Sequence, residues 1–430
     1  MRTLVSSKVL AAQVACPPVS STPEASTPPV DAGIVIEALP SSRNHQTATW
    51  WGYNGSKLVR SGDRVVTSVL DNDVDAGQLY RVVMLQKSGD GPWTRGAAIP
   101  ASAPANIILE PSGQISVFVF EAFNMAGNGA LGSLKRYKFA TPGDITTFTQ
   151  ETVVPNDGTT ETVNIRVGAA VGRDGTLYAG WGINLWGSDL QSQVLYELAP
   201  GSATWTWSKA GTQLGHDFYY PYVLPTEPGV AMLSVQDDYV PPAQGGGNIY
   251  HMTRAFERTG GAWVQTPLAD LSALPIAQTN QNLLQVSDFF RASNGALHAM
   301  TSLYLSGMNN GFVTATRHDV RTDAGWSNSE FPMDDGSCNF VRLFEVDERL
   351  MTLCQTYDKT YLRALGGSKR VVLAFPGPIN GAYPFVAAPR GGTSPDAGFI
   401  DLMFISGSSS DYPNAPAYYA RVPKAALRGL

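Results

Sequence analysis

The sequence lacks the features that would place it in a bilayer or on a nucleic acid. Its 430 residues contain no apolar run that approaches the roughly 20 residues needed to span a membrane. The net charge is only −6 and the isoelectric point is about 5.4, whereas nucleic-acid binding requires a basic stripe. We therefore expect neither a membrane-spanning protein nor a nucleic-acid partner.

Helical periodicity and the common short catalytic motifs are also missing. No amphipathic pattern extends beyond about two helical turns. No set of His and Cys residues has zinc spacing, and neither a phosphate-binding loop nor a G-x-S-x-G elbow is present. What the chain has instead is 43 glycines and 29 prolines, a composition typical of a turn-rich β protein.

Cysteine is scarce, with three residues in the whole chain. Cys338 and Cys354 lie on two expected strands on either side of a turn near Val346. Antiparallel pairing would bring them close enough for a disulfide, which would require an oxidising compartment. Two buried free thiols are an equally common arrangement.

One unit recurs from about Trp50 to the C-terminus, with a period of roughly 50 residues. Its clearest copy has an apolar strand over Asn164–Gly172, a tight turn at Arg173, a second strand from Leu177, and two further strands that end at Trp207. Four strands per unit, repeated along the chain, are typical of a β-propeller. We count seven units and predict an all-β fold, a seven-bladed β-propeller of four-stranded antiparallel blades.

Two further details of the propeller follow from the repeat. Ile34–Leu39 is a short β-like run before the first unit, and we expect it to pair beside Tyr418–Val422 and so close the ring. An aromatic also follows the turn before the fourth strand in five units. This recurrence predicts a packing position between blades and not five binding sites; these aromatics are Trp93, Phe148, Trp205, Trp263 and Trp326.

The N-terminal region differs from the rest. Residues 1–16 resemble a degraded bacterial lipoprotein signal, with small residues before Cys16 as a candidate lipid anchor, and we expect residues 17–32 to be a disordered Pro/Ser/Thr-rich tether. Residues 33–430 form the single propeller domain. We expect an extracytoplasmic monomer, either membrane-tethered or secreted; a plain disordered leader is the alternative.

Ring geometry predicts where a site would lie. Inter-blade loops and loops between second and third strands share one end of a propeller, and the tight turns occupy the other. Amides, carboxylates and exposed aromatics in these loops suit a carbohydrate, although polar loops that are merely solvated would look the same. The substrate-binding candidates are Trp50, Trp51, Asn106, Asn164, Trp186, Asp288, Arg291 and Asn339.

The best acid–base candidates fall in the entry to the fourth unit, Gly215–Tyr222. This segment brings together His216, Asp217, Tyr219 and Tyr220, and a His or Tyr there would take a proton α to a uronate carboxyl group, the first step of β-elimination. Arg166 would neutralise that carboxylate, or form a salt bridge between blades. Hydrolysis by two carboxylates is the alternative.

An acidic loop suggests a metal. Asp71, Asp73 and Asp75 alternate before Gly77, as at the start of a calcium loop, but Val82 stands where an EF-hand carries its bidentate Glu. We expect no required cofactor, with a structural Ca²⁺ as the less favoured alternative to a bare acidic loop.

The unit pattern resembles the sialidase-like superfamily of propellers, which includes BNR-repeat proteins and propeller polysaccharide lyases. Shortened forms of the family's Asp box, Ser/Thr-x-Asp-x-Gly-x-x-Trp, lie at Ser88–Trp93 and Thr322–Trp326, whereas the sialidase Phe/Tyr-Arg-Ile-Pro motif is absent. The resemblance implies an exported carbohydrate-active protein that cleaves an acidic polysaccharide as a lyase or hydrolase. A non-catalytic glycan-binding module and an envelope interaction propeller are the alternatives.

Overall fold

The structure, a computed structural model, is described here for 18 segments of the chain. These are residues 33–40, 54–71, 80–122, 131–154, 161–164, 166–185, 191–211, 217–240, 247–270, 284–303, 315–332, 338, 340–356, 359–377, 379, 383–394, 397–405 and 416–430.

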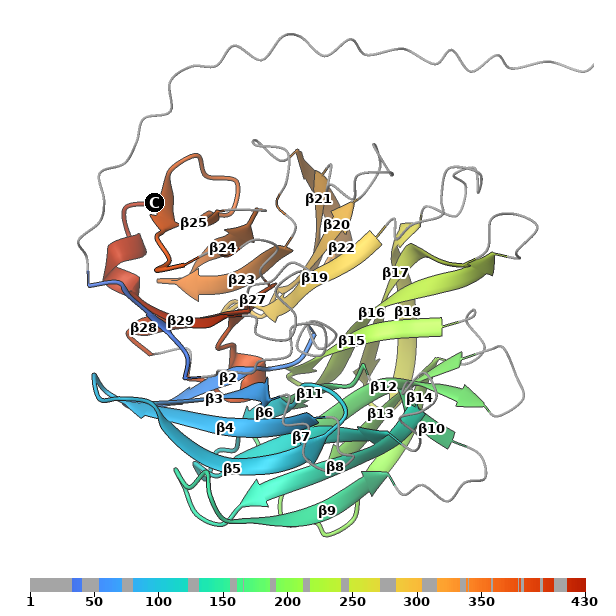
Figure 1. Cartoon of the computed structure of the whole chain (residues 1–430). Coiled ribbons are helices and arrows are strands. Elements are labelled where there is room, and N and C mark those ends of the chain that lie inside the picture. Colours follow the sequence, from blue (N-terminus) through green and yellow to red (C-terminus); the bar gives the residue numbers. More distant parts are fainter. Residues whose placement is uncertain are drawn as a thin grey trace, which may run out of the picture.

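Seven four-stranded antiparallel blades form a ring, which confirms the predicted fold class (Figure 1). In blades 1 to 6 the chain begins at the ring axis with an inner strand and moves outward strand by strand; in blade 7 the outermost strand is β1, from the N-terminal part of the chain. The inner strands are β2 (Leu58–Ser61), β6 (Asn106–Leu109), β11 (Gly168–Val171), β15 (Asp217–Thr226), β19 (Leu284–Arg291), β23 (Phe340–Val346) and β27 (Tyr383–Val386).

The outer strands complete blades 1 to 7 in chain order. Blade 1 adds β3 (Arg64–Asp71), β4 (Tyr80–Ser88) and β5 (Thr94–Ala101). Blade 2 adds β7 (Ile115–Ala122), β8 (Leu131–Phe139) and β9 (Phe148–Val154). Blade 3 adds β12 (Leu177–Leu185), β13 (Gln191–Leu198) and β14 (Thr206–Gly211). Blade 4 adds β16 (Gly229–Val240), β17 (Gly247–Thr259) and β18 (Ala262–Asp270). Blade 5 adds β20 (Leu297–Leu303), β21 (Ala315–Thr322) and β22 (Gly325–Pro332). Blade 6 adds β24 (Arg349–Gln355), β25 (Thr360–Ala364) and β26 (Arg370–Leu373). Blade 7 adds β28 (Phe399–Ile405), β29 (Ala417–Pro423) and β1 (Val35–Ala38).

An additional strand joins two blades, and it corrects the expected start of the third unit. Asn164 is the last residue of β10 (Glu161–Asn164), which pairs with β8 of blade 2 and with β12 of blade 3. The inner strand of blade 3 begins only at Gly168. Arg166 precedes that strand and Asn164 belongs to another one. The alternation of side chains along a strand therefore does not predict whether these two side chains point the same way.

The N-terminal strand closes the ring as predicted. β1 pairs antiparallel with β29, with Val35 opposite Arg421 and Ala38 opposite Tyr418. On the other side of blade 7, Asp401 of β28 accepts hydrogen bonds from Arg60 of β2, at 2.5 and 2.7 Å, and from the hydroxyl of Tyr419. Blade 7 is thus tied to blade 1 by a buried ion pair as well as by packing.

The repeated aromatics pack between blades, as expected from their recurrence. Trp93 of blade 1 donates its indole N–H to Glu37 of blade 7 at 2.7 Å, and Lys87 reaches the same carboxylate at 2.9 Å. In blade 5, Arg321 and Trp326 likewise share Glu257 of blade 4, with the indole bond at 2.8 Å. We call such contacts rim clasps; indole N–H groups make two more, Trp205 to Glu151 at 3.3 Å and Trp263 to Ser208 at 3.1 Å.

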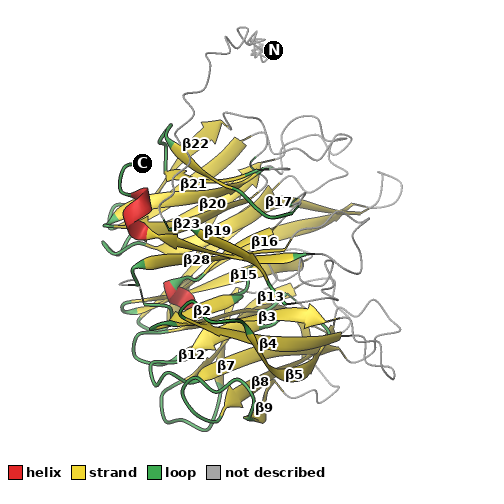
Figure 2. Ribbon diagram, turned by 60° about the vertical axis from the view of Figure 1, so that its left-hand side comes forward, coloured by secondary structure: helices red, strands yellow, loops and turns green. Residues whose placement is uncertain are grey.

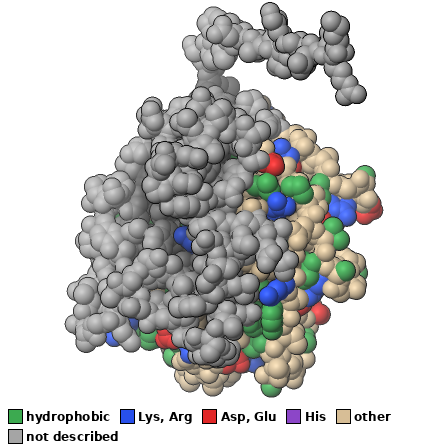
Figure 3. Space-filling model, turned by 90° about the vertical axis from the view of Figure 1, so that its right-hand side faces the viewer, with side chains coloured by type: hydrophobic (Ala, Val, Ile, Leu, Met, Phe, Trp, Pro, Cys, Tyr) green, Lys and Arg blue, Asp and Glu red, His purple; other side chains and the backbone are tan. Residues whose placement is uncertain are grey.

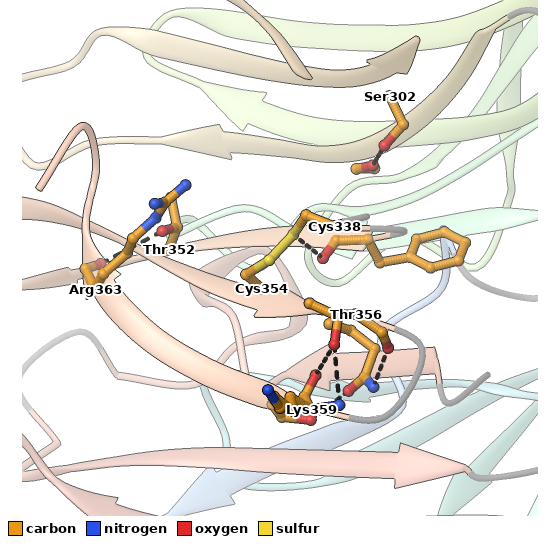
Figure 4. The surroundings of a disulfide bond; sticks show 11 residues. Ser302, Cys338, Thr352, Cys354, Thr356, Lys359 and Arg363 are labelled. Carbon is orange, nitrogen blue, oxygen red and sulfur yellow. Dashed lines mark hydrogen bonds between the residues drawn. A yellow bond between two sulfur atoms is a disulfide. The ribbon is translucent and has the colours of Figure 1, made fainter. Parts of the chain in front are cut away.

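Cys338 and Cys354 form a disulfide with their Cα atoms 5.7 Å apart (Figure 4). Cys354 lies on β24 opposite Val341, and Cys338 lies just before β23. The bond therefore joins the two innermost strands of blade 6, and of the two arrangements that the spacing allows, the structure contains the disulfide.

The two ends of the ring differ. Figure 2 shows the tight turns, in green, at one end of the blades, which we call the turn end; the end at which the inner strands begin is the entry end. Blade 7 departs from the pattern, because its first turn contains the short 3₁₀ helix η4 (Pro389–Gly391), which contacts β6, β11 and β15. A second 3₁₀ helix, η5 (Lys424–Leu427), follows β29. None of the helical segments among the described residues has the length and apolar character to cross a bilayer.

Candidate functional site

A bulge in β15 forms the most distinctive backbone feature at the entry end. Tyr219 pairs with Val235 and Tyr222 with Leu233, so Tyr220 and Pro221 together lie opposite the single residue Ser234. Tyr220 adopts a left-handed conformation with φ of 54°, which costs on the order of 1 kcal/mol or more for a residue with a bulky side chain. Bulges of this kind redirect side chains and are common beside functional sites.

The bulge brings Tyr220 beside Arg166. The guanidinium carbon of Arg166, just before β11, lies 5.3 Å from the centre of the Tyr220 ring, and both side chains are half-buried. The two residues come from neighbouring blades and were predicted separately from the sequence. The structure thus unites one predicted cation with one predicted acid–base residue at the ring axis.

Asn54 supports both residues from across the ring. Its side-chain amide donates to the carbonyl oxygen of Pro221 at 2.8 Å and to that of Arg166 at 3.5 Å. Gly168 completes this contact, since a Cβ there would collide with the Pro221 carbonyl group. Asn54 was not predicted as a functional residue; its only signal is its place just before the first inner strand.

Two predicted substrate-binding residues make contacts between inner strands. Asn106 accepts from the Ser56 amide at 3.2 Å and donates to the Val167 carbonyl oxygen at 3.2 Å, which links blades 1, 2 and 3. Asp288 accepts from the backbone amides of Phe289 and Leu343 at 2.9 and 2.8 Å, which links blades 5 and 6. Both side chains are buried, and a role in substrate binding stays a prediction.

The two other arginines on inner strands lie apart from Arg166. Arg291, a predicted substrate-binding residue, is the last residue of β19 and lies at the turn end, away from the end where that role was expected, 3.8 Å from the carboxylate of Glu227. Arg342 is buried inside the ring, where it donates to Pro384 O at 2.8 Å, to the Tyr222 hydroxyl at 2.7 Å, and to Ser287 O. The structure therefore does not bring Arg166, Arg291 and Arg342 together.

For the other predicted residues the structure gives a position in a strand, or they lie outside the described segments. Asp217 and Tyr219 are in β15, and Asn164 is in β10. Trp50, Trp51, Asp73, Asp75, Trp186, His216 and Asn339 lie outside the described residues. Asp71 accepts from Arg95 at 3.2 Å, and across the described segments no three His, Cys, Asp or Glu side chains are grouped to hold a metal ion. The calcium prediction is neither confirmed nor contradicted.

A cluster of charged side chains lies deeper in the ring and was not foreseen as a group. Lys57, Tyr222, Asp288, Arg342 and Arg390 are each less than 9% exposed; we call them the axial cluster. Arg390 comes from η4, with its guanidinium carbon 4.7 Å from the centre of the Tyr222 ring and one nitrogen 4.0 Å from Asp288. Lys57 donates to the carbonyl oxygen of Ala105 at 2.9 Å.

Burial and mutual repulsion alter the ionisation of this cluster. Burial, reinforced by the charges of Arg342 and Arg390, lowers the pKa of Lys57 to about 7. Burial also lowers the pKa of Arg390. It raises the pKa of Tyr222 to about 12, although the neighbouring Arg342 acts in the opposite direction. Tyr222 therefore stays a neutral hydroxyl at neutral pH.

Figure 3 faces the entry end of the ring. A lysine or arginine side chain is visible near the middle of this face. A guanidinium group paired with a phenol ring offers two kinds of contact: bidentate hydrogen bonds to a carboxylate, and an apolar ring face with a hydroxyl at its edge. These are the contacts that an acidic sugar requires.

The chain matches no family model and no curated protein, but it resembles solved propellers. Trypanosoma rangeli sialidase, as its covalent intermediate, gives a TM-score of 0.47 at 12% identity, covering 90% of this chain and 59% of that one. An α-L-arabinofuranosidase of Fusarium graminearum with arabinobiose gives 0.45 at 10% identity, covering 75% and 94%. A protein named YjhT gives 0.43 at 15% identity, covering 78% and 99%.

These similarities concern architecture. The seven-bladed ring confirms the blade pattern on which the resemblance to the sialidase-like superfamily depends. At these levels of identity a shared fold carries no residue role and no activity from one protein to another.

Proposed function

We propose that the protein is an exported carbohydrate-active propeller that binds an acidic polysaccharide at the entry end and cleaves it beside Tyr220. The observation that carries this proposal is the Arg166–Tyr220 pair, with the guanidinium carbon 5.3 Å from the ring centre. The pair joins a carboxylate-binding group to a phenol within reach of one bound sugar.

The contacts around Arg166 and Tyr220 favour a ligand-binding role for these two residues. Asn54 holds the carbonyl oxygens of Pro221 and Arg166, and Tyr220 keeps a left-handed backbone, with φ of 54°. Strain of this kind persists only where surrounding contacts impose it, and it is concentrated at binding and catalytic sites. Arg166 would neutralise a uronate carboxylate, and Tyr220 or His216 would transfer the proton in β-elimination.

The test uses uronate-containing polysaccharides and three readouts: binding, new reducing ends, and the absorbance of an unsaturated uronate product. Absorbance with reducing ends indicates a lyase, and reducing ends alone indicate a hydrolase. Binding without product would leave a glycan-binding module, and the absence of all three would refute the proposal.

Single substitutions test which residues bind the polysaccharide and which transfer the proton. We expect Arg166→Ala to weaken binding, and Tyr220→Phe and His216→Ala to lose product while binding persists. Arg291→Ala is the matched control, because this arginine lies at the turn end beside Glu227. Equal losses in Arg166→Ala and Arg291→Ala would contradict the assignment of the site to the entry end.

A further inference from the structure

The axial cluster contains more positive than negative charge. Lys57 and Arg342 are each 2% exposed and Arg390 is 8% exposed, whereas Asp288 is the carboxylate that faces Arg390 at 4.0 Å. The charges that act most strongly on Lys57 are the two guanidinium groups. Buried cations are stable only when anionic groups compensate them, so the cluster is one negative charge or more short of balance.

The hydrogen bonds of the cluster are unequally distributed. Arg342 donates to Pro384, Tyr222 and Ser287, and Lys57 donates to Ala105. By contrast, Nη1 of Arg390 is buried and has no hydrogen-bond partner among the described residues.

A second unpaired donor lies beside η4. The hydroxyl of Ser56 is also buried without a partner in the described part of the chain. Ser56 packs against Gly391, the residue after Arg390, so closely that a Cβ on Gly391 would collide with that hydroxyl oxygen. Buried donors without partners are rare in native proteins and call for an unseen acceptor.

We propose that the axial cluster binds a small inorganic anion with the size and charge of chloride, held by Nη1 of Arg390 and balanced by Lys57. A single negative charge there would satisfy the unpaired guanidinium nitrogen and reduce the excess of positive charge. Because the Arg390 side chain is only 8% exposed, the position suits a small anion and not the carboxylate of a polysaccharide. The anion site is therefore separate from the proposed glycan site.

The bound anion is coupled to protonation of Lys57. The charged groups that act on Lys57 are Arg342 on β23 and Arg390 on η4. Arg390 in turn is affected by Asp288 on β19 and Tyr222 on β15. A nearby anion favours the charged ammonium group, so binding takes up a proton when the pH is above about 7, the pKa of Lys57 without the anion. Affinity for the anion consequently falls as the pH rises from 7 to 10.

The decisive experiment is anomalous diffraction from crystals of the full chain soaked in sodium bromide. We expect a bromide peak within hydrogen-bond distance of Nη1 of Arg390. Peaks confined to the protein surface, or a water molecule at that position in saturating bromide, would overturn the proposal.

Thermal unfolding provides a test in solution. At pH 7 and constant ionic strength, sodium bromide should raise the unfolding midpoint relative to sodium gluconate, whose anion is too large to enter. Arg390→Met should lose this difference, and Arg291→Met, at the turn end, should keep it. An equal halide effect in both variants would refute the proposal; if Arg390→Met does not fold, the bromide map of the wild-type protein decides.

Discussion

The rim and the axis of this propeller differ in whether their contacts repeat from blade to blade. At the rim the same contact recurs from blade to blade, as an indole N–H or a basic side chain bound to a polar group of the preceding blade. At the axis no residue repeats from blade to blade, since the axial cluster takes one residue each from blades 1, 4, 5, 6 and 7. Lys57 lies just before β2, Arg390 lies in η4, and Tyr222, Asp288 and Arg342 lie on β15, β19 and β23. Contacts that repeat therefore join the blades at the rim, whereas the contacts inside the ring are individual to each blade.

The two regions also differ in electrostatic balance. In the rim clasps the basic side chains have carboxylate partners, as Lys87 has Glu37 at 2.9 Å and Arg321 has Glu257 at 3.1 Å. At the axis Lys57 is bonded to a backbone carbonyl and repelled by two arginines. We therefore expect substitutions to change pH dependence at the axis and stability alone at the rim.

The largest effect is expected from Lys57. Its pKa in the folded protein, about 7, is below its ordinary 10.5, so the unfolded state binds more protons between these values and stability rises with pH across this window. The contribution is absent below pH 7 and amounts to on the order of 4–5 kcal/mol at pH 10.5. Urea unfolding in gluconate buffers should show this rise in the wild-type protein and lose it in Lys57→Met.

Lys87→Met is the matched control, because this lysine is buried at the rim and paired with Glu37. It should keep the wild-type pH profile. A profile for Lys57→Met that parallels the wild type would show that Lys57 stays charged in the ring and would remove the electrostatic contrast between rim and axis.

The next largest effect concerns the junction between blades 7 and 1. Asp401→Ala leaves Arg60 buried without its partner at 2.5 Å, and loss of one member of a buried ion pair costs about 3–5 kcal/mol. Urea denaturation measures the change. Arg428→Ala, which breaks an exposed pair with Asp347 at 2.7 Å, should cost at most about 1 kcal/mol. Similar losses in both variants would mean that the closure depends on packing and not on the ion pair.

A rim clasp should contribute less. Glu257 accepts from Trp326 and Arg321 and is partly exposed, so Glu257→Gln should cost about 1.5–3 kcal/mol, the range of a hydrogen bond to a charged group. A double-mutant cycle with Trp326→Phe measures the coupling of the two side chains. Additive effects would show that the indole N–H and the carboxylate are independent, and the clasp would then be a packing contact only.

The same contrast explains how much the sequence could predict. The ring, its closure by Ile34–Leu39 and the inter-blade place of Trp93 and its equivalents depend on features that recur, and recurrence is visible in a single sequence. Tyr220 and Arg166 could be named as candidates because aromatic and basic residues stand at the blade entries.

Other features of the structure correspond to no repeated pattern in the sequence. The bulge at Tyr220 and the strand β10 depend on backbone pairing between blades. Arg390 lies in the first turn of blade 7, the least regular unit, and only the folding of η4 toward β6, β11 and β15 brings it to the ring axis. Such contacts join residues far apart in the chain, and spacing within one unit does not reveal them.

The smallest change in stability is expected at Tyr220, where the effect on function should be largest. Tyr220→Gly removes a left-handed strain of about 1–2 kcal/mol but loses side-chain packing and adds about 0.5–1 kcal/mol of unfolded-chain entropy, so the free energy of unfolding should change by less than about 1 kcal/mol. Loss of the contact with Arg166 at 5.3 Å should weaken binding of uronate oligosaccharides about two- to thirtyfold, the range of one cation–π interaction. Calorimetry and urea denaturation on the same preparation separate the two effects. Large destabilisation with unchanged affinity would make Tyr220 a residue of the ring core, and the strain at its backbone would then belong to blade packing like the contacts at the rim.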